Sequence, residues 1–240
     1  MPFISVIEII PLSDLGRHFR ADYRVRMVDA DVNGFLRMDG IARLLQDVAT
    51  DDSHDAVVAS MDPWVVRRTT LRFVEGTHWP RYLDRLTLTT WCGGVGPAWA
   101  ERRTNFDYEG QLVLEAAAIW VPVDASGHPV RLRENFFDVY GESARNRKVS
   151  SRIPKAPIPE SAMRRSWPLR ATDVDTMGHV NNAALWQTLC EVVAAPLRSV
   201  SVSHHASIDR EDVVSLVTAP GQLWLTVDGE VRLSAQYEAL

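Results

Sequence analysis

The sequence predicts an α+β protein built from two homologous halves, and three observations support this fold class. The chain has 240 residues, of which 46% are hydrophobic, which is enough to form the core of one large domain or two small ones. A stretch that begins at Tyr23 recurs at Trp167, at an offset of 144 residues. In each half, an amphipathic helix pattern precedes several strand-like segments. This order favours one helix covered by a curved antiparallel sheet in each half.

The internal repeat pairs YRVRMVDADVNGFLRMDGIARLLQDVATD with WPLRATDVDTMGHVNNAALWQTLCEVVAA. At the 144-residue offset, the matching pairs are Arg26 with Arg170, Asp29 with Asp173, Asp31 with Asp175, Gly34 with Gly178, Leu45 with Leu189 and Asp47 with Glu191. Each copy leads from a short extended segment, through an acidic turn that contains glycine, into a helix pattern. Because chance does not account for so many spaced matches, we predict two homologous subdomains.

In the first half, the spacing of apolar residues predicts a helix over roughly residues 39–50. Ile41, Leu44, Leu45 and Val48 form one apolar stripe at helical spacing. Segments rich in β-branched and aromatic residues follow, separated by glycine-containing turns. These predicted strands cover residues 64–74, 85–94, 98–110 and 111–127.

We place the first subdomain at residues 1–144, a connection at 145–165 and the second subdomain at 166–240. The connection contains three prolines, and its seven Lys or Arg residues against one Glu give a formal charge of +6. Proline spacing favours an extended linker, which is either a solvated tether or a docking site for an acidic partner. After the second helix pattern, the predicted strands are short and cover residues 201–208, 213–219, 222–227 and 230–238.

Composition and charge disfavour several classes of function. The net charge of −5 and the pI near 5.8 argue against nucleic-acid binding. The two cysteines, Cys92 and Cys190, form neither a CxxC motif nor a Cys/His cluster, so we expect no disulfide framework, no metal site and a reducing, cytoplasmic setting. No apolar run approaches the roughly 18 residues of a membrane span, and no export signal or cofactor motif is expected.

The second copy of the turn, DVDTMGHVNN at residues 173–182, concentrates polar residues at a strand-to-helix junction. Unpaired N–H groups at a helix start can bind an oxygen that becomes negative during a reaction. Asp175 could attack a carbonyl or draw a proton from water. His179 could orient water or share the proton transfer, because the ordinary pKa of histidine is near 6.5. These two residues are our catalytic candidates.

Three neighbours of this pair have both a structural and a substrate-binding interpretation. Asn181 and Asn182 are either helix N-caps or substrate contacts. Gly178 either meets the conformational needs of the turn or lets a substrate approach the main chain. Asp173 is interpreted as a brace for the turn or a partner of Arg170.

Comparison with the first copy distinguishes the residues that the two turns share from those found only in the second. The first copy, DADVNGFLRMDG, keeps the Asp-x-Asp-x-x-Gly pattern. It has Phe35 in place of His179, and Arg37 and Met38 in place of the two asparagines. We therefore predict one reactive centre, in the second half, and an apolar binding surface in the first.

These residues give the chain a resemblance to the acyl-ACP thioesterase family, from about Tyr23 to Val231. It rests on YRVRMVDADVNG, LLQDVATDDSHDA, WVVRR, TTWCGG, RRTNFDYEG, IWVPVD and above all DVDTMGHVNN. The resemblance implies two tandem hotdog subdomains, each a long helix wrapped by a curved antiparallel β-sheet. It also implies hydrolysis of a fatty acyl thioester, with Asp175 and His179 acting at the thioester.

The sequence departs from the family at two places. Met177 stands where the family has Asn, and a thioether does not hydrogen-bond water usefully. A functional Glu of the family, about thirty residues after the His, aligns with Ser207, and a cysteine next to it aligns with Ile208. Asp209 or Glu211 could replace that Glu.

The resemblance implies that the acyl chain lies beside the first helix and sheet, with the thioester near Gly178 and His179. The acyl group would be carried by acyl carrier protein or coenzyme A. Two other functions stay open: a non-hydrolytic acyl-binding protein on the same scaffold, and a hydratase or dehydratase of acyl thioesters. The tandem halves form a pseudo-dimer, which is compatible with a monomer or a homodimer.

Overall fold

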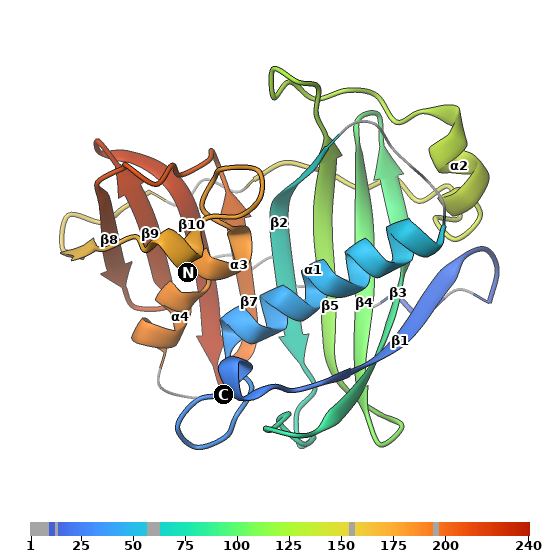
Figure 1. The fold of residues 1–240 in the computed structure, drawn as a ribbon, viewed down its shortest axis with the longest axis horizontal. Helices are drawn as coiled ribbons and strands as arrows, with labels where there is room; N and C mark the ends of the chain where they lie inside the picture. Colours follow the sequence, from blue (N-terminus) through green and yellow to red (C-terminus); the bar gives the residue numbers. More distant parts are fainter. Residues whose placement is uncertain (1–9, 13, 57–62, 154–156, 194–196) are drawn as a thin grey trace.

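The computed structural model describes residues 10–12, 14–56, 63–153, 157–193 and 197–240, and its strands form one antiparallel sheet (Figure 1). The order across the ten-stranded sheet is β1-β3-β4-β5-β2-β7-β10-β9-β8-β6. The strands of the first half are β1 (His18–Arg24), β2 (Trp64–Phe73), β3 (Arg85–Gly96), β4 (Trp99–Tyr108) and β5 (Gln111–Pro122). Those of the second half are β6 (Met163–Trp167), β7 (Leu197–His204), β8 (Val214–Ala219), β9 (Gln222–Val227) and β10 (Glu230–Ala239).

The strand order is symmetric about its centre, where β2 pairs with β7. The first half runs 1-3-4-5-2 toward the centre, and the second half runs 6-8-9-10-7 toward it from the other edge. At the seam Thr70 lies opposite Ser201, and their hydroxyl oxygens are 3.0 Å apart. The sequence repeat is therefore a repeat of structure, and the two halves share one continuous sheet.

Helix α1 (Met38–Asp55) lies across the first-half sheet (Figure 1). Its buried face includes Ile41, Leu45 and Val48, as the apolar stripe predicts. One apolar core spans both halves and includes Leu71 of β2 and Val200 of β7, so the seam is packed as a protein interior. Fully burying a side chain of this kind contributes about 1.5–3 kcal/mol.

The second half has less helix than the first. Helices α3 (Asn182–Leu185) and α4 (Gln187–Val192) occupy the position that matches α1, separated at Trp186. The amide of Trp186 donates to the carbonyl of Ala183, three residues back, which is the tighter spacing of a 3₁₀ turn. Both short helices pack against α1, and none of the described helices is long and apolar enough to cross a membrane.

Parts of the predicted connection belong to the folded structure. The carbonyl of Arg147 accepts the amide of Val95 on β3 at 2.9 Å, and the indole of Trp99 donates to the carbonyl of Val149 at 2.9 Å. Strand β6 begins at Met163, inside the predicted connection. Helix α2 (Glu134–Tyr140) precedes this region and was not predicted from the sequence. It packs at the end of the first half that is far from α3 and α4 (Figure 1).

Candidate active site

The acidic turn of the second half is built from its own backbone and the side chain of Asp175. The amide of Gly178 donates to the carbonyl of Asp175 at 3.0 Å, and the amide of Asp175 donates to the carbonyl of His179 at 2.9 Å. Asp175 Oδ1 accepts the amide of Met177 at 2.9 Å. Gly178 has φ +84°, and a Cβ there would meet nothing within 4 Å. Backbone conformation, and not lack of space, therefore favours glycine at this position.

Asp173 braces the turn from inside. Its side chain is buried, and Oδ2 accepts the amide of Arg170 at 2.8 Å. Its carbonyl accepts the amide of Asn181 at 2.7 Å, which ties the two ends of the turn together. These contacts match the bracing role expected for Asp173.

The two asparagines face different surroundings. Asn181 is the N-cap of α3, and its Oδ1 accepts the amide of Ala183 at 2.8 Å. Asn181 Nδ2 lies 3.5 Å from Asp175 Oδ2, at the limit of a hydrogen bond. Asn182 is the first helical residue, and its side chain borders a small cavity. The N-cap interpretation thus applies to Asn181, which also contacts the catalytic candidate.

The side chain of His179 contacts Asp209, a partner that the sequence did not indicate. Its Nδ1 is 2.7 Å from Asp209 Oδ1, and the side chain is 53% exposed. Asp209, considered above as a replacement for the missing Glu, is thus brought to His179 by the fold. Ile208 is buried, and its carbonyl accepts the amide of Val180, so its part here is structural.

A pocket of about 920 Å³ lies between α1, the first-half sheet and α2. Its apolar part is rich in aromatic side chains. Trp64, Trp91, Cys92, Ala100, Trp120, Phe136 and Tyr140 supply this surface. At the second half, the pocket is bordered by Asp175, Thr176 and Asn181. Neither Gly178 nor His179 lines it, so the structure places Asp175 at the pocket and His179 outside its wall.

A buried ion cluster holds α2 against α1 at this pocket. Asp52 on α1 is almost fully buried and accepts hydrogen bonds from Arg102 Nη1 at 2.6 Å and from the hydroxyl of Tyr140 at 3.0 Å. Arg17 also pairs with Asp52, at 2.8 Å. Burial, together with the charge of Asp52, raises the pKa of Tyr140, so the phenol stays protonated and donates. Sequence reasoning missed this cluster because the residues that each bond to Asp52 are 35 to 88 positions away from it.

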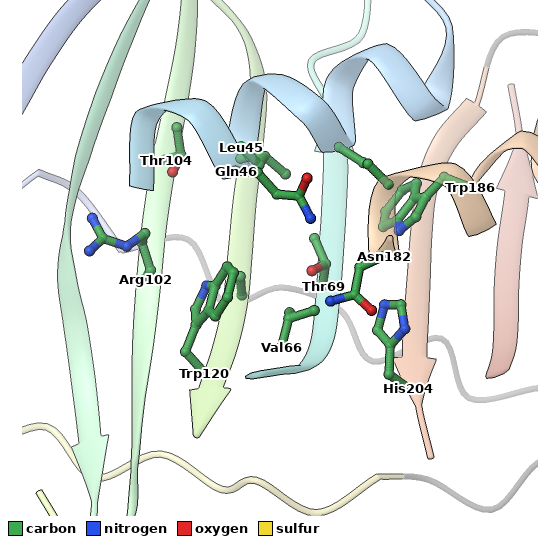
Figure 2. Close-up of a pocket in the computed structure, with 13 residues that line it drawn as sticks. Leu45, Gln46, Val66, Thr69, Arg102, Thr104, Trp120, Asn182, Trp186 and His204 are labelled. Atoms are coloured by element: carbon green, nitrogen blue, oxygen red, sulfur yellow. The ribbon is translucent and has the colours of Figure 1, made fainter. Parts of the chain in front are cut away.

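A second, smaller cavity of about 30 Å³ lies beside the large pocket, and Gln46, Arg102 and Trp120 line both. Figure 2 shows Gln46, Thr69 and Asn182 directed toward one space, with Trp120 and His204 on either side. Burial and the charges of His205 and Arg67 lower the pKa of His204 to about 4. No sequence motif marked His204 or Trp120 as functional residues. Within the described part of the chain, no group of three or more His, Cys, Asp or Glu residues is placed to hold a metal.

Comparison with known proteins agrees with this geometry over nearly the whole chain. Residues 16–140 match the acyl-ACP thioesterase N-terminal domain, and residues 157–237 match the acyl-ACP thioesterase C-terminal domain. An uncharacterised protein of Mycobacterium tuberculosis is 28% identical over 202 residues, which cover 81% of this chain and 80% of the relative.

Two solved structures share the fold. A protein of Lactobacillus plantarum, provisionally described as an oleoyl thioesterase, superimposes with a TM-score of 0.78 at 19% identity, covering 96% of this chain and 99% of that one. A 12:0-ACP thioesterase from Umbellularia californica gives a TM-score of 0.74 at 14% identity, covering 92% and 96%. The α+β fold with tandem hotdog halves, predicted from the sequence, is confirmed.

Proposed function

This chain belongs to the acyl-ACP thioesterase family, and from that premise we propose that it hydrolyses the thioester of a fatty acyl group carried by acyl carrier protein or coenzyme A. The observation that carries the proposal is the pocket of about 920 Å³ with Asp175 at its border. Pockets of this size accommodate most of the surface of a small ligand. Its aromatic walls suit an acyl chain, and a carboxylate stands where the chain would end at the second half.

Asp175 is the proposed catalytic residue. The turn uses Oδ1, whereas Oδ2 has only the long 3.5 Å contact with Asn181 Nδ2 described above, so Oδ2 is the oxygen proposed for chemistry. In one route this carboxylate takes a proton from water, whose oxygen adds to the acyl carbon as the carbon–sulfur bond breaks, and the thiolate leaves with that proton. In the other route Oδ2 attacks the acyl carbon directly, and water then hydrolyses the resulting anhydride.

His179 is proposed as the second functional residue, on the solvent side of the turn. Its Nδ1 is engaged by Asp209, which leaves Nε2 for a substrate group or water. Because the side chain is exposed, it suits contact with the carrier arm as the thioester enters, and it can share the proton transfer there. Gly178, Asn181 and Asn182 are proposed to position the substrate around this pair.

One observation favours a non-hydrolytic acyl-binding function as the second candidate. Asp31, in the first half, makes the same side-chain bond to the amide of Asn33 at 2.9 Å as Asp175 makes to Met177. A carboxylate with this contact therefore has a structural use without any reaction. Met177, at the family's Asn position, is 62% exposed and adds no hydrogen-bonding group to the turn through its side chain.

A substrate panel separates these functions. The protein is mixed with acyl-CoA and acyl-ACP thioesters of several chain lengths, and free thiol is followed with a chromogenic reagent. We expect thiol release by the wild type. Acyl binding without thiol release would favour the carrier function, and a change in enoyl absorbance without thiol would favour a hydratase.

The carrier is tested by the salt dependence of binding. Arg145, Lys148, Arg152 and Arg164 of the connection are exposed, and an acidic carrier protein would be attracted to them. Screening over a Debye length of about 10 Å at 0.1 M salt weakens such attraction. We expect acyl carrier protein to bind more tightly at low salt, measured by calorimetry. Binding that is independent of salt would contradict docking at this segment.

A further inference from the structure

The small cavity is lined by two residues whose buried side-chain nitrogens lack protein partners. Among the described residues, three buried side-chain nitrogens have no hydrogen-bond partner: Trp120 Nε1, His204 Nε2 and Arg232 Nε. Two of the three, Trp120 and His204, belong to residues that line this cavity. His204 is only 7% exposed, so bulk solvent does not satisfy it.

An unpaired buried polar group loses the hydrogen bond that it makes with water in the unfolded chain. Because two residues with such groups line one cavity, a polar occupant in contact with both nitrogens would complete them. The volume of about 30 Å³ suits about two water molecules, since each needs at least about 10–15 Å³. A buried water needs two to four polar partners, and Thr69, Gln46 and Asn182 add to the two nitrogens.

The chemistry of the cavity fits a neutral occupant, because the guanidinium of Arg102 on its wall is paired with Asp52 at 2.6 Å. With its pKa lowered to about 4, His204 is uncharged at neutral pH and offers a hydrogen bond without charge attraction for an anion. The indole N–H of Trp120 is a donor only, whereas a neutral imidazole nitrogen can accept. A water molecule can accept from the indole and donate to the imidazole.

The cavity also lies next to the proposed reaction centre. It shares Gln46, Arg102 and Trp120 with the acyl pocket. Asn182 on its wall follows Asn181, whose amide nitrogen is 3.5 Å from Asp175 Oδ2. The small cavity thus adjoins the acyl pocket that Asp175 borders.

We propose that this cavity binds the water that hydrolyses the thioester, and that His204 and Trp120 are positioning residues for it. The inference rests on the proposed hydrolase function. The oxygen of this water forms the new bond to the acyl carbon, and the carbon–sulfur bond breaks. One proton passes through Asp175 to the departing thiolate, and His204 orients the water without taking that proton.

The test compares steady-state thiol release from one acyl-CoA by the wild type, His204→Leu, His204→Gln and His205→Gln. His205 is the matched control, because it is the next residue and its Nε2 is bonded to Ser234 Oγ at 2.9 Å. We expect His204→Leu to lower kcat about 10-fold, the rate equivalent of one ordinary hydrogen bond, with KM within about twofold. His204→Gln, which retains a polar group, should recover most of kcat, and His205→Gln should match the wild type.

A high-resolution crystal structure of the wild type provides a readout besides activity, with ordered water expected against His204 and Trp120. A wild-type kcat in His204→Leu, or a change in KM alone, would overturn the positioning role. A dry cavity, with a higher Tm for His204→Leu, would do the same. If His204→Leu does not fold, Trp120→Phe removes one donor and is judged by the same loss of kcat. Absence of thiol release by the wild type would instead overturn the hydrolase function on which this inference rests.

Discussion

In the turns of the first and second halves, a glycine amide donates to the carbonyl of the second Asp at 3.0 Å. Both glycines, Gly34 and Gly178, have φ +84°. The Asp side chains accept a backbone amide two residues on at the same distance of 2.9 Å. The turns differ in their surroundings, because Asp175 borders the acyl pocket and Asp31 does not. The Asp-x-Asp-x-x-Gly pattern therefore specifies the backbone conformation of the turn. The place of the second copy at the pocket makes that copy the candidate for catalysis.

The largest expected effect comes from replacing the matching carboxylates. Asp175→Asn should lower kcat for thiol release by about 10²- to 10⁴-fold, the usual contribution of a general base. Asp31→Asn is the matched control and should leave kcat near the wild-type value. In both variants the amide oxygen can still accept the backbone N–H, so we expect both to fold. Equal effects of the two variants would show that the carboxylate acts only in the turn.

The second comparison exchanges the residues that distinguish the copies. His179→Phe gives the second turn the residue of the first, and we expect kcat to fall by about 10²-fold through loss of proton transfer or orientation. Phe35→His, the reverse change, should leave kcat unchanged. Thermal unfolding checks that the exposed site tolerates both substitutions. Full activity of His179→Phe would show that His179 has no role in catalysis, and Asp175 would then be the remaining catalytic candidate.

The glycines should behave alike, because the same backbone angle applies to both. Gly34→Ala and Gly178→Ala should each lower the free energy of unfolding by about 1–2 kcal/mol, the cost of left-handed backbone for an L-residue. Urea unfolding measures this. If Gly178→Ala and Gly34→Ala have the same stability but only Gly178→Ala raises KM, the result would support close approach of a substrate to the main chain at Gly178.

The smallest expected effect concerns Met177. The first copy has Asn33 at the matching position, so Met177→Asn restores an amide to the second turn. We expect a gain in kcat of no more than about 10-fold, the value of one additional hydrogen bond to water or the carbonyl. Thiol release under saturating substrate checks this. A loss of activity would indicate that this protein has adapted its site around the methionine.

Several elements could be predicted from local pattern alone. The apolar stripe at Ile41, Leu44, Leu45 and Val48 predicted α1, although the helix extends to Asp55. Strands β2 to β5 lie close to their predicted ranges, because β-branched residues and glycine turns mark them, whereas no strand was predicted over β1. The family resemblance implied one long helix in the second half, but the helix is interrupted at Trp186, whose side chain is buried. Helix α2 was missed because its pattern covers only two turns, with Phe136 and Tyr140 one turn apart.

In the candidate site, too, some residues were predicted from the sequence and others were found only in the structure. Comparison of the two copies predicted Asp175 and His179 as catalytic candidates, and this stays a prediction. The bracing interpretation of Asp173 agrees with its contacts. It did not indicate that His179 pairs with Asp209 or that His204 and Trp120 meet at a cavity. Those neighbours lie on separate strands and loops, and a single sequence carries no signal that joins them.

The sequence by itself determined the repeat, the α+β class and the family, because each depends on short-range spacing of residue types. Only the tertiary structure decided that the two halves share one sheet through β2 and β7, that Asp175 borders the pocket, and that His179 lies outside its wall. The physical reason is that a pocket is formed by side chains far apart in sequence. Their meeting depends on how the strands pair and the helices pack, and not on the local preferences of any one segment.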